Sequence, residues 1–363
     1  MKKVLSLLLV LVLALSLVAC DNKSGSTSGT TDGGDSDVTK IALLLPYIGD
    51  QSYFDVTYQG LSLLKEKYGD AVEVKLIEMG TDAAGWETAN RQAAEAGYDI
   101  IISGNFEYEA AMLAVAKDYP DIKYLNFDYS DAEANSLPNV YAVSYACNEL
   151  GYLTGVVAAI KSKSGVIGAV GGMDLNGIRQ FIAGYFQGAM AVNPDIKVLS
   201  SFVGDFSDAN KAKEISLNMI AQGADVIWGV AGGAGNGVFA AAAENPGVWA
   251  IGVDTDQYVT MAGQPELQAT ILTSGMKNCD KAILAGVTAI MEGTAPYGTQ
   301  EFLTYKDGAV GLAENDYYKA NMTEEELALV EEYTSKILTG EVSVVDELVT
   351  PGVYEELLAE VSD

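Results

Sequence analysis

The sequence predicts an α/β protein with two lobes, each a parallel sheet flanked by helices, joined by a hinge. Its 363 residues are enough for about two domains. From Lys40 onward, short apolar runs alternate with stretches in which apolar residues recur at helical spacing. The alternation occurs twice, because a new series begins after a helical stretch at 148–161. Apolar strands separated by helices are typical of parallel sheets that are covered on both faces.

Ten strands are predicted from these apolar runs. The first five are 41–45, 72–78, 100–103, 124–128 and 140–144, and the second five are 166–170, 198–203, 226–230, 249–253 and 269–273. The segments between them include Tyr58, Leu61, Leu64 and Tyr68 at helical spacing. A ligand of such open sheets binds outside the carboxyl ends of the strands, so the residues that follow each strand are candidate contacts.

The amino terminus predicts export and a lipid anchor. Residues 1–19 combine two lysines with an apolar run, which is typical of a secretory signal peptide. Cys20 follows Leu-Val-Ala and resembles the lipidated cysteine of a bacterial lipoprotein. An ordinary signal peptide with an incidental cysteine, or an uncleaved anchor, is the alternative. Residues 20–39 then form a flexible tether rich in Gly, Ser, Thr and Asp, which places the protein on the extracytoplasmic face of the cell membrane.

The expected domains follow from these boundaries. Residues 1–19 are the signal peptide and 20–39 the lipidated cysteine with its linker. Lobe 1 comprises 40–145 and about 274–303, and lobe 2 comprises 146–273 and about 304–363. A helix that begins near Thr323 is assigned to packing on lobe 2, because Glu324, Glu325 and Glu326 in its first turn suit the helix dipole.

Composition excludes several functions. The chain has a formal net charge of −29 and no histidine. Without imidazole there is no Ser-His-Asp triad and no His-ligated metal, which leaves carboxylate, lysine, tyrosine or cofactor chemistry open. We expect no metal site and no cofactor. Arg91 and Arg179 are the only arginines, and binding to nucleic acid depends on basic side chains, so no nucleic acid is expected. Cys147 and Cys279 are either two unrelated buried thiols or a pair that the fold brings together.

The predicted strand ends are rich in glycine, carboxylates and aromatic rings. Gly232 to Gly237 follows a strand and precedes a helix, but it matches neither nucleotide-phosphate glycine motif. Carboxylates at the other strand ends repel phosphate and accept hydroxyl donors. Aromatic rings there supply flat faces. These features point to a neutral, hydroxylated ligand with a flat part; the carboxylates are Asp50, Asp55, Asp128, Asp205, Asp254 and Asp256, and the rings are Tyr53, Phe54 and Phe206.

Five motifs resemble the basic membrane protein (BMP) family. They are Gly49–Asp55 (GDQSYFD), Asn148–Gly155 (NELGYLTG), Ala231–Gly235 (AGGAG), Gly252–Gln257 (GVDTDQ) and Thr273–Lys277 (TSGMK), and the resemblance spans residues 40 to about 312. It implies a type 1 periplasmic binding protein fold and a non-enzymatic lipoprotein that binds a nucleoside, with a purine expected, and delivers it to the permease of an ABC importer.

The resemblance also implies roles for individual residues. Asp50 and Ser52 contact the ligand, Tyr53 stacks on the base and Phe206 closes the sandwich from the other lobe. Asp254 and Lys277 hold the ribose hydroxyls, Gly232 and Gly233 offer backbone groups, and Asp128 lies near the hinge. In the family, an asparagine commonly follows the aromatic residue of the first loop. In this sequence Phe54 and Asp55 follow Tyr53 instead. Aspartate only accepts hydrogen bonds, so the base contacts and the choice between Tyr53 and Phe54 as stacking ring stay open.

Each of these residues has a structural alternative. Asp50 and Ser52 suit a helix cap, and Lys277 can pair with a carboxylate. Trp86, Trp228 and Trp249 lie within helix or strand patterns and are assigned to the core. Three other functions stay open: a binding protein for a sugar or other small polar ligand, a ligand sensor, and a nucleoside hydrolase that uses a pair of carboxylates.

Overall fold

The computed structural model describes residues 38–362, so the predicted signal peptide and Cys20 lie outside the described residues. Two six-stranded sheets form the framework. In spatial order, sheet 1 consists of β11 (Gln300–Leu303), β5 (Val140–Tyr145), β4 (Lys123–Asn126), β3 (Ile100–Ile102), β1 (Thr39–Leu45) and β2 (Val72–Glu78). Sheet 2 consists of β12 (Val310–Leu312), β10 (Ile271–Lys277), β9 (Trp249–Asp254), β8 (Val226–Val230), β6 (Val166–Gly171) and β7 (Lys197–Phe202).

The two sheets repeat one topology. All paired strands of sheet 1 are parallel, and in sheet 2 only β12 runs antiparallel, alongside β10. The order β2-β1-β3-β4-β5 in sheet 1 recurs as β7-β6-β8-β9-β10 in sheet 2. In such doubly wound sheets a ligand binds where the strand order reverses, which is between β1 and β3 and between β6 and β8.

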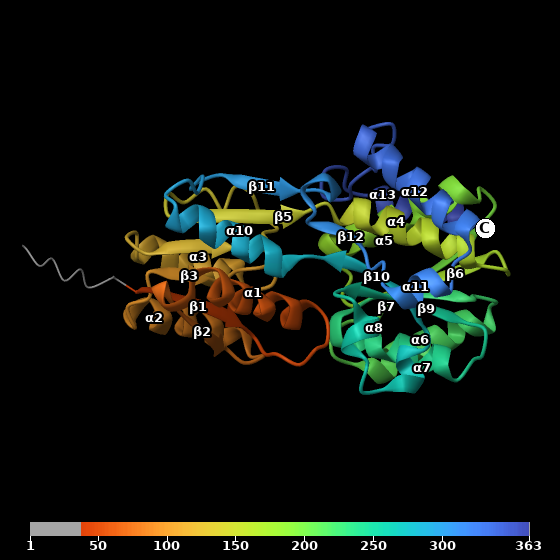
Figure 1. Ribbon diagram of the computed structural model, residues 1–363, viewed down its shortest axis with the longest axis horizontal. Coiled ribbons are helices and arrows are strands. Elements are labelled where there is room, and N and C mark those ends of the chain that lie inside the picture. Colours follow the sequence, from red (N-terminus) through yellow and green to blue (C-terminus); the bar gives the residue numbers. More distant parts are fainter. Residues whose placement is uncertain (1–37, 363) are drawn as a thin grey trace, which may run out of the picture. The chain divides into compact units, whose positions relative to one another are not determined.

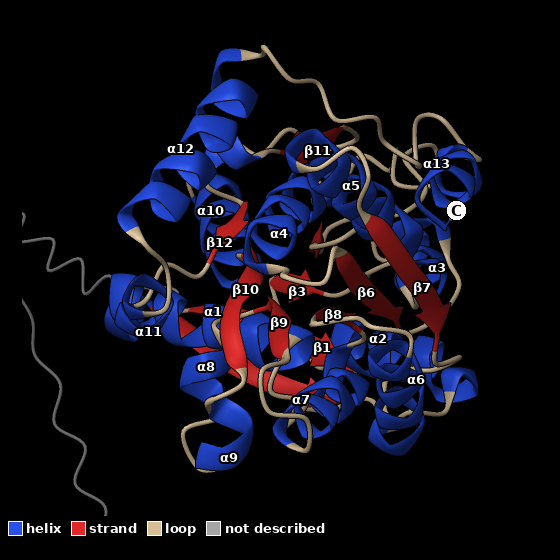
Figure 2. Ribbon diagram, turned by 90° about the vertical axis from the view of Figure 1, so that its right-hand side faces the viewer, coloured by secondary structure: helices blue, strands red, loops and turns tan. Residues whose placement is uncertain are grey.

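Helices cover both faces of each sheet. Alternate residues of β1 point to opposite faces, so Leu43 packs in one apolar cluster and Leu44 in another. On sheet 1, α1 (Tyr53–Tyr68) and α10 (Cys279–Met291) cover one face, and α2 (Trp86–Glu95) and α3 (Glu109–Asp118) the other (Figure 1). On sheet 2, α4 (Cys147–Lys161) and α5 (Asn176–Val192) lie opposite α6 (Ala209–Ala221) and α7 (Asn236–Ala243), as Figure 2 shows.

The remaining helices are short or lie near the carboxyl terminus. Among them, α12 begins with a capping box in which Thr323 and Glu326 each accept a backbone hydrogen bond from the other residue, as its acidic first turn suggested. The α-helices are α8 (Gln257–Thr260), α9 (Pro265–Gln268), α11 (Asp316–Ala320), α12 (Glu324–Thr339) and α13 (Val353–Ser362), and the 3₁₀ helices are Gly69–Ala71, Ala83–Gly85, Gly232–Gly235 and Tyr305–Asp307. Among residues 38–362, no helix combines the length and apolar character needed to cross a membrane.

Helices α4 and α5 touch through glycine. A Cβ atom on Gly184 would lie 2.1 Å from the carbonyl oxygen of Asn148, and one on Gly151 would lie 1.9 Å from that of Phe181. Only glycine permits this approach of the two backbones. The contact fixes the first turns of α5 against the start of α4, and therefore fixes the side chains that α5 directs toward the carboxyl ends of the strands.

The chain passes between the sheets three times, after β5, after β10 and after β11. These three connections form the hinge of the two-lobed fold. The predicted α/β fold with two largely parallel sheets is confirmed, and the first nine strands lie within two residues of their predicted ends.

The tenth predicted strand, 269–273, is displaced. The strand extends from Ile271 to Lys277, because Ser274 and Gly275 continue it past its predicted end. Gly275 is required there by space, since a Cβ atom would lie 2.4 Å from the side chain of Leu150. The edge strands β11 and β12 were not predicted, because they are only four and three residues long and β11 is largely exposed.

Candidate functional site

A cavity of about 700 Å³ lies at the carboxyl ends of strands from both sheets. Its size is within the range of ordinary small-molecule sites. Sheet 1 contributes residues that follow β1, β2, β3, β4 and β5. Sheet 2 contributes residues that follow β6, β7 and β8 and the last residues of β9 and β10. The residues discussed below that line it are Tyr47, Asp50, Tyr53, Phe54, Trp86, Phe106, Glu107, Asp128, Ser130, Cys147, Gln180, Phe181, Phe206, Gly232, Asp254, Lys277 and Leu348.

The loop between β1 and α1 forms one wall and is held by two carboxylates. Asp50 accepts hydrogen bonds from the backbone N–H groups of Ser52, Phe54 and Asp55, at 2.9–3.1 Å. Asp55 accepts from the N–H groups of Gly49 and Gln51. The side chain of Asp50 therefore caps the start of α1, as the structural alternative proposed, although Asp50 also lines the cavity. Ser52 occupies the N-cap position, but its side chain makes no capping hydrogen bond.

Two residues of this loop bind sheet 2 directly. The Ser52 hydroxyl donates to Asp254 Oδ2 at 2.7 Å, and both residues are buried. The side chain of Gln257 donates to the backbone carbonyl oxygen of Gln51, and the side chain of Asn236 donates to the side-chain oxygen of Gln51. Gln51 and Asp254 adopt φ angles of 57° and 67°, and among the described residues no other non-glycine residue has a positive φ. The left-handed region is costly for non-glycine residues, so the two backbones are strained where the lobes meet.

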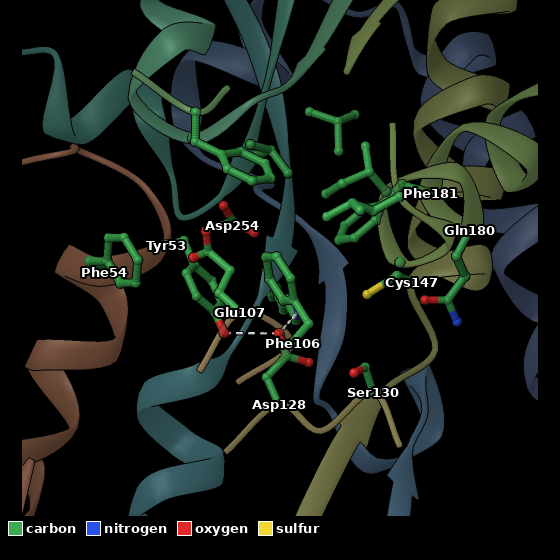
Figure 3. A pocket seen from close by; sticks show the side chains of 18 of the residues that line it. Tyr53, Phe54, Phe106, Glu107, Asp128, Ser130, Cys147, Gln180, Phe181 and Asp254 are labelled. Carbon is green, nitrogen blue, oxygen red and sulfur yellow. Dashed lines mark hydrogen bonds and ion pairs between the residues drawn. The ribbon is translucent and has the colours of Figure 1, made fainter. Parts of the chain in front are cut away.

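A buried ion pair lies at the centre of the site. Lys277 Nζ is 2.5 Å from Asp128 Oδ2, and the Tyr53 hydroxyl donates to the same oxygen at 2.8 Å (Figure 3). The ammonium also lies 4.8 Å from the ring centre of Tyr145 and 5.6 Å from that of Phe181, within cation–π range. Burial disfavours the charged lysine, but the charge of Asp128 and other nearby groups outweighs it and raises the pKa of Lys277.

Asp254 is a buried carboxyl group whose pKa is shifted upward. Burial raises its pKa to about 6, although Lys277 and the Ser52 hydroxyl favour the charged form. Burial also raises the pKa of Asp50 and of Glu107. The cavity therefore carries carboxylates in excess of its single lysine, whose charge is already paired with Asp128, and this excess disfavours an anionic ligand.

Aromatic rings from both lobes face the cavity. The ring centre of Phe106, after β3, lies 6.2 Å from that of Tyr53 and 6.0 Å from that of Phe206, after β7. Phe54 packs edge-on against Tyr47 at 4.9 Å. Trp86, assigned to the core from the sequence, packs against the core and also lines the cavity, because it begins α2 beside the strand ends.

The structure brings together most of the residues that the sequence singled out. Asp50, Tyr53, Phe54, Asp128, Phe206, Gly232, Asp254 and Lys277 line the cavity. Ser52, Asp55 and Gly233 do not. Ser52 is fully buried and bonded to Asp254, Asp55 is bonded to the loop backbone, and Gly233 packs against Asp50, so these three support the wall instead of facing its interior.

Sequence reasoning missed several lining residues. Phe106 and Glu107 directly follow the strand-end pair Gly104-Asn105, so the strand-end rule could have found them had the loop been followed two residues further. Gln180 and Phe181 lie inside α5, and Leu348 comes from the segment after α12, so no local pattern marks them. Cys147 lines the cavity, and both Cys147 and Cys279 are free and buried, which confirms two unpaired thiols.

Comparison with known proteins shows the family. The model of the Bmp family, described as ABC transporter substrate-binding protein PnrA-like, matches residues 38–346. The chain belongs to the Bmp family. It is 33% identical to the CD4+ T-cell-stimulating antigen of Listeria innocua, with 94% of this chain and 98% of that protein covered. It is 31% identical to the ABC transporter nucleoside-binding protein BmpA of Lactococcus lactis, with 95% and 99% covered.

A solved structure supports the same assignment. An ABC transporter solute-binding protein from Aeropyrum pernix superposes with a TM-score of 0.74 at 26% identity, covering 89% of this chain and 98% of that one. The protein is thus a Bmp-family substrate-binding protein of an ABC transporter with the periplasmic-binding-protein fold, and it is not an enzyme. Proteins of this class act on the extracytoplasmic side of the membrane.

The raised pKa of Asp254 predicts a pH-dependent stability. The folded protein retains a proton up to about pH 6 that the unfolded chain loses near its ordinary pKa of 3.8, so Asp254 destabilises the ligand-free protein increasingly as the pH rises through this interval. We expect Asp254→Asn to increase the free energy of unfolding more at pH 7.5 than at pH 5, by about 1 kcal/mol. Denaturant unfolding at both pH values measures this, and an equal effect at both would contradict it.

Proposed function

We propose that this protein binds a nucleoside, with a purine preferred, between its two lobes and delivers it to an ABC importer. The observation that carries the proposal is a cavity in which aromatic rings from both lobes lie beside a buried polar centre. Phe106 lies between Tyr53 of its own lobe and Phe206 of the other. Rings suit a flat base, and the nearby carboxylate and ammonium suit hydroxyl groups.

The polar centre matches the sugar part of such a ligand. Asp254 uses one oxygen for Ser52, and an ionised carboxylate has about four lone-pair sites, so it can still accept hydroxyl donors of a ribose. The ammonium of Lys277 has three donors, of which Asp128 takes one. A ribose hydroxyl pair placed here would supply donors to buried Asp254 and so reduce the cost of its charge.

The charge of the cavity sets a limit on the ligand. Lys277 forms its ion pair with Asp128, and among the described lining residues Asp50, Glu107 and Asp254 form no ion pair. A nucleoside is neutral, whereas a nucleotide brings at least one phosphate charge into this field. The relative from Lactococcus lactis is named as nucleoside-binding, which agrees with the proposal.

A thermal-shift panel tests the ligand class. Adenosine, guanosine, inosine, adenine, ribose, glucose and inosine 5′-monophosphate are each added to the purified protein, because a ligand that binds only the folded state raises the melting temperature. We expect the nucleosides to raise it most and the monophosphate to have little effect. A larger shift with ribose or glucose than with any nucleoside would contradict the proposal and favour a sugar-binding protein.

Phe206→Ala tests the aromatic sandwich. Stacking of a base on an aromatic side chain contributes about 1–3 kcal/mol, so calorimetry should show a loss of nucleoside affinity of about tenfold or more. Phe302→Ala is the matched control, because Phe302 lies exposed on β11 and does not line the cavity. Equal affinities for both variants and the wild type would contradict the stacking role.

We further propose that Cys20 carries a lipid that anchors the protein to the membrane. The support is the signal-like run of residues 1–19 before Cys20 and the Gly- and Ser-rich segment after it. In cells, the full-length protein should partition with membranes, and Cys20→Ser should release it or leave its precursor unprocessed. Mass spectrometry of the mature amino terminus measures the modification, and an unmodified Cys20 in membrane-bound protein would contradict the anchor.

A further inference from the structure

Gln180 contributes a polar side chain to the cavity that neither the motifs nor the strand ends indicated. It lies in the second turn of α5 and is 2% exposed. Figure 3 shows it across the cavity from Tyr53 and Glu107, beside Cys147. A buried amide that faces a ligand cavity restricts which ligand groups can occupy the space beside it, because buried polar groups require partners.

Both hydrogen-bond donors of this amide are directed away from the ligand space. Its nitrogen donates to Asp346 Oδ2 at 2.9 Å and to the carbonyl oxygen of Tyr145 at 3.4 Å. Among the hydrogen bonds of residues 38–362, none ends on the Gln180 amide oxygen, and Figure 3 shows this oxygen turned toward the cavity. The side chain therefore presents an acceptor to the ligand.

Asp346 accepts the shorter of the two hydrogen bonds that fix this orientation, and the carbonyl oxygen of Tyr145 accepts the other. Asp346 lies in the segment 341–352 between α12 and α13, which we call the carboxyl-terminal strap. Its second carboxylate oxygen accepts the N–H group of Leu348, whose side chain lines the cavity. An ionised carboxylate only accepts hydrogen bonds, so it can face the nitrogen of Gln180 and not the oxygen.

The strap itself is fastened to α4 and α5 by amide side chains. Asn148 donates to the carbonyl oxygen of Val344 at 2.8 Å. Gln187 both donates to the carbonyl oxygen of Val345 and accepts from its N–H group, at 2.9 and 2.8 Å. Asp346 is therefore held in place from both sides, and the orientation of Gln180 is set before a ligand arrives.

We propose that Gln180 is a specificity-determining residue of the ligand site and that Asp346 is the positioning residue that orients the amide oxygen of Gln180 toward the ligand. The ligand must then offer an O–H or N–H donor at this position. The inference rests on the proposed function, under which the donor is a sugar hydroxyl or an N–H group of the base. A ligand without it would leave the buried oxygen unpaired, and such a mismatch strongly reduces affinity.

The test compares the purine nucleoside that binds most tightly among adenosine, guanosine and inosine with analogues that each lack one donor. These are its 2′-, 3′- and 5′-deoxy forms and, for the base, purine riboside where the parent is adenosine, or inosine where the parent is guanosine, titrated by calorimetry into the purified protein. For the wild type we expect one analogue to bind about tenfold or more weakly than the parent. Gln180→Leu should bind that analogue and the parent within about twofold of each other, because the acceptor is gone.

Asp346→Asn tests the positioning role. The new side chain has a single oxygen, and when this oxygen accepts from the N–H group of Leu348 its NH2 group faces Gln180. That NH2 group pairs with the Gln180 oxygen, so the Gln180 nitrogen turns toward the ligand and gives up its 3.4 Å hydrogen bond to Tyr145. We expect the tenfold preference for the parent over that same analogue to fall below about threefold. Gln187→Leu is the matched control, because Gln187 also holds the strap from α5 but does not line the cavity, and it should keep the full preference.

The outcomes separate the two proposals. If no nucleoside binds the wild type, both are overturned. If nucleosides bind but Gln180→Leu changes the affinities for the parent and for every analogue by the same factor, the role of Gln180 is overturned and the proposed function stands. The same conclusion follows if Gln180→Leu changes no affinity. If Asp346→Asn and Gln187→Leu reduce the preference for the parent nucleoside equally, Asp346 only helps to hold the carboxyl-terminal strap in place, and its positioning role toward Gln180 is overturned. Should Gln180→Leu fail to fold by circular dichroism, Gln180→Met replaces it with the same expected result.

Discussion

The ion pair between Lys277 and Asp128 is the interaction on which the rest of the site depends. Lys277 ends a strand of sheet 2, and Asp128 follows a strand of sheet 1, so the pair joins the lobes at the hinge. Both side chains are at most 7% exposed. Burying two charges costs several kcal/mol per ion unless the remaining donors and acceptors are satisfied. Tyr53 supplies one such donor, which ties the loop after β1 to the same centre.

The contact between the lobes therefore carries an electrostatic cost, which a bound ligand would offset under the proposed function. Bringing Asp254 against Ser52 places a further carboxylate near Asp50 and Asp128, and burial of that carboxylate favours its protonation. The repeated sheet order makes this meeting possible, since it directs the reversal points of both sheets toward one cavity. Ligand hydroxyls that donate to Asp254 would stabilise the closed arrangement selectively, which is the condition for a ligand to shift a conformational equilibrium.

The parts of the structure that could be predicted from the sequence are those with a regular local pattern, such as the buried strands and the residues at their ends. Buried parallel strands are continuous apolar runs, so β1 and β8 were found almost to the residue, and Tyr53 and Asp254 could be placed at strand ends. Features that depend on distant segments left no such pattern. Lys277 was expected near the site, but its pairing with Asp128 requires both sheets. Gln180 resembles any buried helical residue, and only the strap, more than 160 residues later, gives its amide a direction.

Small-angle X-ray scattering with and without a purine nucleoside would show whether a ligand draws the two lobes together. We expect the ligand-free protein to populate a more open arrangement and adenosine, guanosine or inosine to decrease the radius of gyration, whereas Phe206→Ala should require much more ligand for the same decrease. A radius of gyration that no nucleoside changes, together with a decrease on addition of a sugar such as ribose or glucose, would contradict this expectation.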